Sequence, residues 1–210
     1  MLYFPYGDGR KALKAYNYKA HTNSCLPSDK RDEQFAGDVF KKEVLDMFHE
    51  MRRKKQLLSE EACQDILRRG TSGVLALGDR GDYPYAVPIS YVYDGSKIYF
   101  HGAKVGHKME AIEKNSRVSF CVIDQDRIVP EKYTTYFRSV IVFGEIRILE
   151  EEPEKRRAIE KLAVKYAPQD SPEGRQEAID RDYGPLCMLE LAIEHMTGKE
   201  AIELVRERQK

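Results

Sequence analysis

The sequence predicts an α+β protein, mainly β with peripheral helices, whose six short strands form an antiparallel barrel or a strongly curved sheet. Three observations support this fold class. The chain has 210 residues, which fits one domain with a short appendage. Its strand-like segments follow one another through hairpin-type links, which disfavours alternating βαβ units. Helical patterns gather mainly before and after these segments.

The N-terminal part lacks any apolar period. Residues 1–37 mix Tyr, Lys, Asn, Gly and Pro, so we expect an extension there and a folded domain over residues 38–210. Apolar residues recur at helical spacing over residues 40–51, which predicts an amphipathic helix. A second helix is predicted from the N-cap Ser59 to the stop signal Gly70.

Strand patterns fill the middle of the chain. The turn-rich residues 78–82 separate two apolar segments that we expect to pair as a hairpin. Residues 124–135 are polar and predict a loop before the longest strand. The predicted strands are 73–77, 85–93, 97–101, 117–123, 139–149 and 186–193. The further predicted helices are 108–114, 152–167 and 175–183.

Composition disfavours several classes of function. Lysine plus arginine and aspartate plus glutamate number 35 each, so no overall positive field attracts nucleic acid or an anionic membrane. No apolar run approaches a membrane span, and the first residues lack the pattern of a secretion signal, so we expect a cytoplasmic protein. The widely spaced Cys25, Cys63, Cys121 and Cys187 favour free thiols over two disulfides.

One segment carries a candidate anion site. Residues 98–112 place a strand, a glycine-containing turn and a helix start in succession, with lysines at positions 104 and 108. Free backbone N–H groups at the helix start, an ammonium and an imidazole can hold a terminal phosphate, although lysines around a turn are more often solvated surface. His101 and His107 are metal-ligand types, but no third ligand is near in sequence, so no metal site is predicted.

Several motifs occur in the order and spacing of a known family. They are Met51-Arg52-Arg53-Lys54 and the segments 83–88, 99–108, 139–144 and 196–199. Over about residues 40–200, the chain resembles the FMN-binding split-barrel family, and it looks most like the nitroimidazole-resistance proteins, relatives of pyridoxamine 5′-phosphate oxidase. The resemblance implies a six-stranded antiparallel split β-barrel, FMN as cofactor and a homodimer.

The resemblance also implies roles for individual residues. Tyr85 and Ser90 stand where the oxidase branch has an arginine and a lysine, at the ends of a strand that lies along the flavin. His107 and Lys108 replace an arginine-lysine pair on the phosphate, and Ser139 matches a ring contact that the other subunit could supply. The full set of implied cofactor-binding residues is Tyr85, Ala86, Val87, Pro88, Ile89, Ser90, Phe100, His101, His107, Lys108 and Ser139.

The function implied by the resemblance is that of an FMN-dependent oxidoreductase, a reductase of a small-molecule electron acceptor such as a 5-nitroimidazole. His101 would orient the acceptor or supply a proton, or it is a passive neighbour of the flavin. A flavin-binding or sensing protein without turnover is an alternative. Pyridoxamine 5′-phosphate oxidation is weaker, because residues 194–199 lack that branch's Arg-x-His element. Haem and deazaflavin binding are also known in the superfamily.

Overall fold

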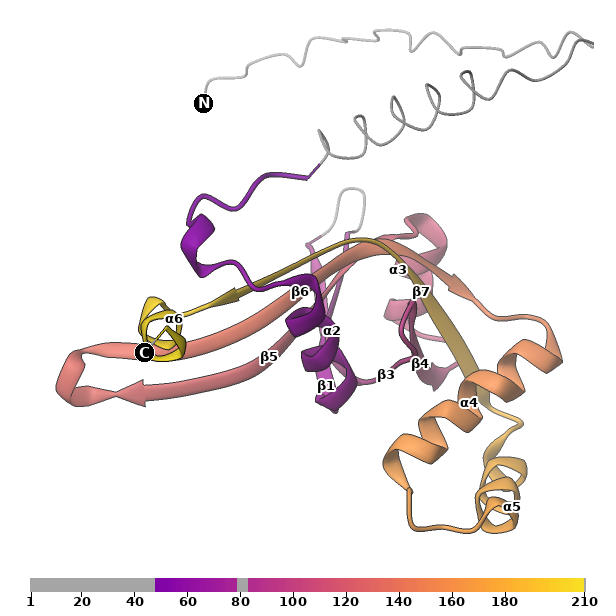
Figure 1. Ribbon diagram of the computed structural model, residues 1–210. Helices are drawn as coiled ribbons and strands as arrows, with labels where there is room; N and C mark the ends of the chain where they lie inside the picture. The colour runs from indigo at the N-terminus through magenta and orange to yellow at the C-terminus, as the bar shows by residue number, and fades with distance from the viewer. Residues whose placement is uncertain (1–47, 79–82, 210) are drawn as a thin grey trace, which may run out of the picture. The chain divides into compact units, whose positions relative to one another are not determined.

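A seven-stranded antiparallel sheet forms the body of the computed structural model, which describes residues 48–78 and 83–209 (Figure 1). The strands are β1 (Ser72–Leu77), β2 (Tyr85–Ser90), β3 (Val92–Tyr93), β4 (Lys97–Ala103), β5 (Arg117–Val129), β6 (Thr134–Ile148) and β7 (Leu186–Glu200). The helices are η1 (Lys54–Gln56), α2 (Glu60–Arg69), α3 (His107–Lys114), η2 (Pro130–Lys132), α4 (Glu152–Tyr166), α5 (Pro172–Asp182) and α6 (Ile202–Arg208). The predicted extension, residues 1–37, lies outside the described residues.

The order of the strands makes the sheet roll up. The order is β2-β1-β5-β6-β7-β4-β3, so β2 and β3 are its two outer strands. They are also consecutive in the chain, and only Tyr91 separates them. The two edges of the sheet must therefore lie close together, which confirms the predicted antiparallel split barrel. The strand count is seven instead of six, because the predicted strand 85–93 divides at Tyr91.

Tyr91 is held where the chain passes from one edge to the other. Its side chain is fully buried, and its hydroxyl donates to the Leu67 carbonyl oxygen at 2.9 Å. Its backbone N–H donates to the Tyr166 hydroxyl at 3.0 Å. The side chain of Tyr91 is thereby bound to α2, and its backbone is bound to α4.

The main core fills the inside of the barrel. The Phe120 ring packs edge-to-face against Tyr91 and Phe100, with ring centroids 4.9 and 5.1 Å apart. The apolar face of α2 adds Ile66 and Leu67, both buried. A smaller cluster forms where α4 packs on the sheet and is built of Val92, Tyr99, Leu149, Ala158, Leu162 and Met188.

The predicted boundaries of α2 are confirmed. The Ser59 hydroxyl accepts a hydrogen bond from the Ala62 N–H at 3.2 Å, and the Gly70 N–H donates to the Ile66 carbonyl oxygen at 2.9 Å. The predicted helix over 40–51 lies largely outside the described residues, and its described end, 48–51, is not helical.

The predicted loop at residues 124–135 is wrong. Here β5 and β6 continue as a paired hairpin with η2 at its tip, and β7 likewise runs on to Glu200 beyond the predicted end at residue 193. The hairpin extends past the barrel in Figure 1, and most side chains of residues 124–129 are exposed or half-buried. Few side chains of this hairpin are buried, Tyr136 being one of them, so little alternation of apolar residues is required and its sequence resembles a loop.

Helix α6 follows β7 and was not expected. It is short, seven residues, and the Ala201 N–H before it donates to the Phe137 carbonyl oxygen at 2.9 Å. Within the described residues, no helix is long and apolar enough to cross a membrane.

Gly144 offers a test of the sheet packing. It lies at a register shift between β6 and β7, where a Cβ atom would come within 1.9 Å of the Ala192 carbonyl oxygen. Gly144→Ala should therefore lower the free energy of unfolding by about 1–3 kcal/mol, measured by urea denaturation. Gly184→Ala is the matched control, because nothing lies within 4 Å of its added Cβ. Equal stability of the two variants would contradict this packing.

Candidate functional site

The end of β4 and the start of α3 form the centre of the candidate site. Gly106 precedes α3 with a φ of 123° and a ψ of 170°, a conformation that only glycine adopts readily. No side chain of the described residues caps this helix start. The first N–H groups of α3 are therefore available to an anion. Residues 101–108 are called the cationic turn below.

Lys108 lies over the backbone of β4. A Cβ atom on Gly102 would come within 2.5 Å of the Lys108 Nζ, so the missing side chain at position 102 makes room for the ammonium. Burial lowers the pKa of Lys108 from its ordinary value, and the neighbouring Cys187 thiol opposes this shift. The ammonium thus sits in a partly dehydrated place, where one charge interacts strongly with an anion.

His101 stands beside this lysine. It pairs in register with Met188 on β7, and its side chain remains exposed. Partial burial lowers the pKa of His101 below 6.5, and the positive charge of Lys108 lowers it further. The imidazole is therefore mainly neutral at pH 7, with one ring nitrogen as donor and the other as acceptor.

An aromatic contact connects β2 to the cationic turn. The Tyr85 ring lies against the His107 ring, with centroids 4.3 Å apart and an angle of 30° between the planes. The structure therefore brings four predicted site residues together: Tyr85, His101, His107 and Lys108. The stacking itself was not predicted, because nothing in the spacing of Tyr85 and His107 indicates that the two residues meet.

The remaining predicted residues of β2 divide between two faces. The side chains of Val87 and Ile89 pack against the main core, as does that of Tyr85. Ala86 and Pro88 are exposed, and Ser90 is half-buried. Proline lacks an N–H and is tolerated on an outer strand such as β2. A ligand on the outer side of β2 would meet small side chains and backbone.

Phe100 and Ser139 lie away from this cluster. Phe100, the residue before His101 on β4, is fully buried in the core. Its ring therefore supports the strand from inside the barrel. Ser139 pairs with Lys199 on β7, whereas His101 pairs with Met188. These β7 partners are eleven positions apart, about 35 Å along a strand. Within one chain, Ser139 is not brought to the cationic turn.

Positive charge is concentrated near the cationic turn although the chain as a whole is neutral. Burial raises the pKa of the Cys187 thiol, and the charges of Lys108, Lys155 and Lys104 oppose that rise. Lys104, Lys108 and Lys155 are thus near this buried thiol, and Lys155 also pairs with Glu152 at 2.9 Å. Such local charge favours an anionic group over water.

The described residues hold no group of three or more His, Cys, Asp and Glu side chains arranged for a metal ion. Cys63, Cys121 and Cys187 are free thiols, and Cys25 lies outside the described residues.

The fold and the cationic turn define a split-barrel protein with a candidate site for a phosphorylated ligand. The family model described as pyridoxamine 5′-phosphate oxidase matches residues 59–200. The chain belongs to this family, and the predicted resemblance is confirmed.

One curated protein is similar to part of the chain. An uncharacterized protein of Rhizobium meliloti, RA0666, is 30% identical over 89 residues, which cover 42% of this chain and 54% of that protein. The chain thus spans about half the length of this curated relative.

Two solved structures share the fold. A candidate 5-nitroimidazole antibiotic resistance protein of Bacteroides thetaiotaomicron has a TM-score of 0.56 and 19% identity, over 69% of this chain and 86% of that one. An FAD-binding protein of Mesorhizobium loti has a TM-score of 0.52 and 24% identity, over 70% of this chain and 97% of that one. At these identities the likeness concerns the fold alone.

The pKa of His101 tests the geometry of the cationic turn. Replacing Lys108 by methionine, an uncharged side chain of similar length, removes a positive charge beside the imidazole. In Lys108→Met, the pKa of His101 should therefore rise toward 6.5 from its lowered value. NMR titration of the histidine ring protons measures the shift, with His49 as the internal reference. An unchanged His101 pKa would mean that the ammonium does not lie beside the ring.

Proposed function

We propose that this protein is an FMN-dependent oxidoreductase that reduces a small acceptor, of which a nitroaromatic such as a 5-nitroimidazole is the leading candidate. The observation that carries the proposal is the cationic turn, where the Lys108 ammonium, His107 and the uncapped start of α3 meet beside His101. The similar FAD-binding protein and the candidate nitroimidazole-resistance protein support the flavin and the acceptor class.

The cationic turn fits the phosphate of a flavin mononucleotide. A phosphate dianion needs cations and several donors, and the turn offers an ammonium, an imidazole and backbone N–H groups at one place. The residue at this positive φ is Gly106, which has no side chain to obstruct the approach to these N–H groups. The contact between the Tyr85 and His107 rings holds the cationic turn against β2.

The outer side of β2 fits a flat ring system. Ala86 and Pro88 are exposed and small, so a planar ligand can approach the strand closely. Bound flavin supplies the redox chemistry, and the protein supplies orientation and electrostatics.

His101 is the residue that we propose acts on the acceptor. Reduction of a nitro group to a nitroso group consumes two electrons and two protons and releases water, and reduced nicotinamide is the proposed source of the electrons. Because its pKa is lowered, His101 is mainly neutral at pH 7 and orients the acceptor through its ring N–H. Below the lowered pKa, the imidazolium can also supply a proton.

We also propose that the working form is a homodimer. Ser139 lies about 35 Å along the strands from the level of His101 in the same chain. A ring contact by Ser139 therefore requires a second copy, and closed two-fold dimers are the commonest oligomers.

The direct test is the cofactor and the reaction. Heat-released flavin is identified by chromatography as FMN or FAD, and oxidation of a reduced nicotinamide nucleotide is followed with and without a nitroimidazole. Release of FMN together with acceptor-dependent oxidation supports the proposal. Tight flavin binding without turnover would favour the non-catalytic alternative, and turnover of pyridoxamine 5′-phosphate instead would favour the oxidase.

Lys108→Ala should weaken FMN binding by about 1.5–3 kcal/mol, because it removes one charge-assisted hydrogen bond to the phosphate. Quenching of flavin fluorescence on titration measures the affinity. Arg181→Ala is the control, since this exposed arginine lies on α5 and pairs with Asp182. Unchanged affinity in Lys108→Ala would remove this lysine from the site.

His101→Ala should retain FMN and slow acceptor reduction by about 10²- to 10⁴-fold, the usual contribution of a positioned acid or base. Steady-state rates are compared at equal flavin occupancy, because lost cofactor would imitate lost catalysis. Loss of the flavin itself would identify His101 as a cofactor contact. Full activity with FMN bound would leave it as a passive neighbour.

Light scattering after size exclusion should give twice the 24.3 kDa of one chain for the FMN-bound protein. A 24.3 kDa particle that still binds FMN tightly would rule out a site shared between two copies.

A further inference from the structure

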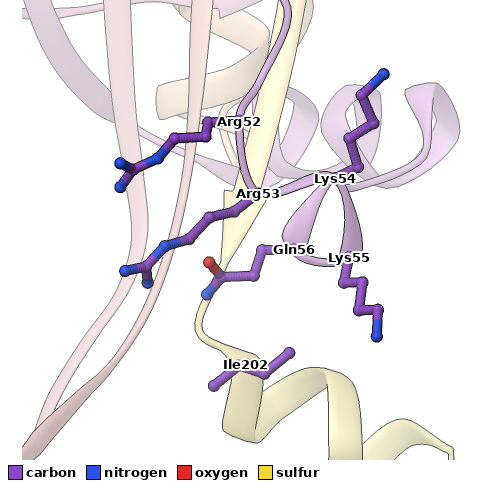
Figure 2. A pocket seen from close by; sticks show the side chains of 6 residues that line it. All are labelled: Arg52, Arg53, Lys54, Lys55, Gln56 and Ile202. Atoms are coloured by element: carbon purple, nitrogen blue, oxygen red, sulfur yellow. The ribbon is translucent and has the colours of Figure 1, made fainter.

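A second cationic site lies at the far end of β7 from the cationic turn. It is a surface hollow of about 480 Å³, called the basic hollow below (Figure 2). Its lining consists of Arg52, Arg53, Lys54, Lys55, Gln56 and Ile202. Next to the hollow, Lys199 on β7 pairs with Ser139. Lys199 lies eleven positions along β7 from Met188, the partner of His101, so the basic hollow is separate from the cationic turn of the same chain.

The floor of the basic hollow is fixed to the sheet. The Leu58 N–H donates to the Gly198 carbonyl oxygen at 3.0 Å, and the Gln56 Nε2 donates to the Glu200 carbonyl oxygen at 3.0 Å. The Glu200 carboxylate is itself buried and forms ion pairs with Arg138 at 3.2 Å and Arg208 at 2.6 Å. The hollow therefore rests on a rigid, internally neutralised base.

The charges at the rim are largely without partners. Lys54 pairs with Glu50 at 2.7 Å, whereas Arg52, Arg53 and Lys55 have no acidic partner among the described residues. In Figure 2, the side chains of Arg52 and Arg53 extend to the left of the view, and those of Lys54 and Lys55 extend to the right. Two guanidinium groups on one side suit the oxygen atoms of a phosphate.

Gln56 provides an independent sign of a ligand. Its side chain is 4% exposed, yet its Oε1 has no hydrogen-bond donor among the described residues. Turning the amide over would not help, because Nε2 is already bound to the Glu200 carbonyl oxygen. A buried carbonyl oxygen without a donor is costly, and an N–H or O–H group from outside the described residues would satisfy it.

We propose that the basic hollow binds a small organic phosphate that carries an N–H or O–H donor, with a nucleoside monophosphate as the representative ligand. Arg52 and Arg53 would hold the phosphate, and Gln56 Oε1 would accept the donor after a small movement of the side chains that cover it. Ile202 offers an apolar contact to the organic part. A volume of about 480 Å³ suits a small molecule. Within one chain, the basic hollow is separate from the flavin site proposed at the cationic turn.

Isothermal titration of the full-length chain with AMP, inorganic phosphate and adenosine tests this proposal. AMP should bind at least tenfold more tightly than either phosphate or adenosine, because only AMP offers both the anion and the donor. Equal affinity for phosphate and AMP would overturn the proposal. Binding of a single-stranded oligonucleotide without binding of AMP would also overturn it and indicate a nucleic-acid surface.

Variants locate the binding. The double variant Arg52→Ala/Arg53→Ala should weaken AMP binding at least tenfold, and both side chains are exposed, so the fold should persist. Arg181→Ala, which removes an exposed arginine on α5, should leave AMP binding unchanged. Gln56→Leu should abolish the preference for AMP over phosphate, and its thermal midpoint is checked because the residue is buried. If Gln56→Leu does not fold, the double arginine variant decides.

One further comparison separates the two cationic sites. AMP binding should survive in Lys108→Ala. If Lys108→Ala loses AMP binding while Arg52→Ala/Arg53→Ala keeps it, the nucleotide binds at the cationic turn, and the basic hollow is not a phosphate site.

Discussion

Tyr91 is the single residue between the two outer strands of the sheet, and the barrel depends on how it is held. Because β2 and β3 are consecutive in the chain, they cannot lie at opposite edges of a flat sheet, so the seven strands must curve round. The buried hydroxyl of Tyr91 donates to the Leu67 carbonyl oxygen near the end of α2, and its backbone N–H donates to the hydroxyl of Tyr166, the last residue of α4. These two bonds fix the junction, and the junction in turn brings the start of β2 within reach of α3. The contact between Tyr85 and His107 follows from this closure.

The two cationic sites are built differently from one another. At the cationic turn, a lysine lies over glycine backbone in a partly dehydrated place, and its charge shifts the pKa of the neighbouring His101. At the basic hollow, exposed cations stand over a base in which Glu200 is already neutralised by Arg138 and Arg208. Since the chain has no net charge, neither site draws on a general positive field. Salt should therefore weaken anion binding less at the partly dehydrated cationic turn than at the exposed cations of the basic hollow.

Much of the fold could be predicted because the signals were local. Ser59 and Gly70 mark the ends of α2 through capping bonds. The turn-rich sequence of residues 78–82 predicts the first hairpin, and β1 and β2 do pair. The site was predicted where the chain is contiguous, over residues 101–108. The polar hairpin after residue 123 could not be recognised, because few of its side chains are buried and its apolar residues therefore show little alternation. The meeting of Tyr85 with His107 and the buried amide of Gln56 depend on long-range pairing, which no spacing in the sequence indicates.

The pairing of β4 with β7 also determines when the site can form during folding. His101 pairs with Met188, a partner far along the chain, whereas β1 with β2 and β5 with β6 form pairs that are close in sequence. When distant segments pair, the chain loses conformational entropy before the stabilising contacts between the segments form. The β5–β6 hairpin can therefore assemble early, and β4 gains its place only when the C-terminal strand arrives. A chain released before β7 is complete would hold most of the sheet but lack the strand that supports His101.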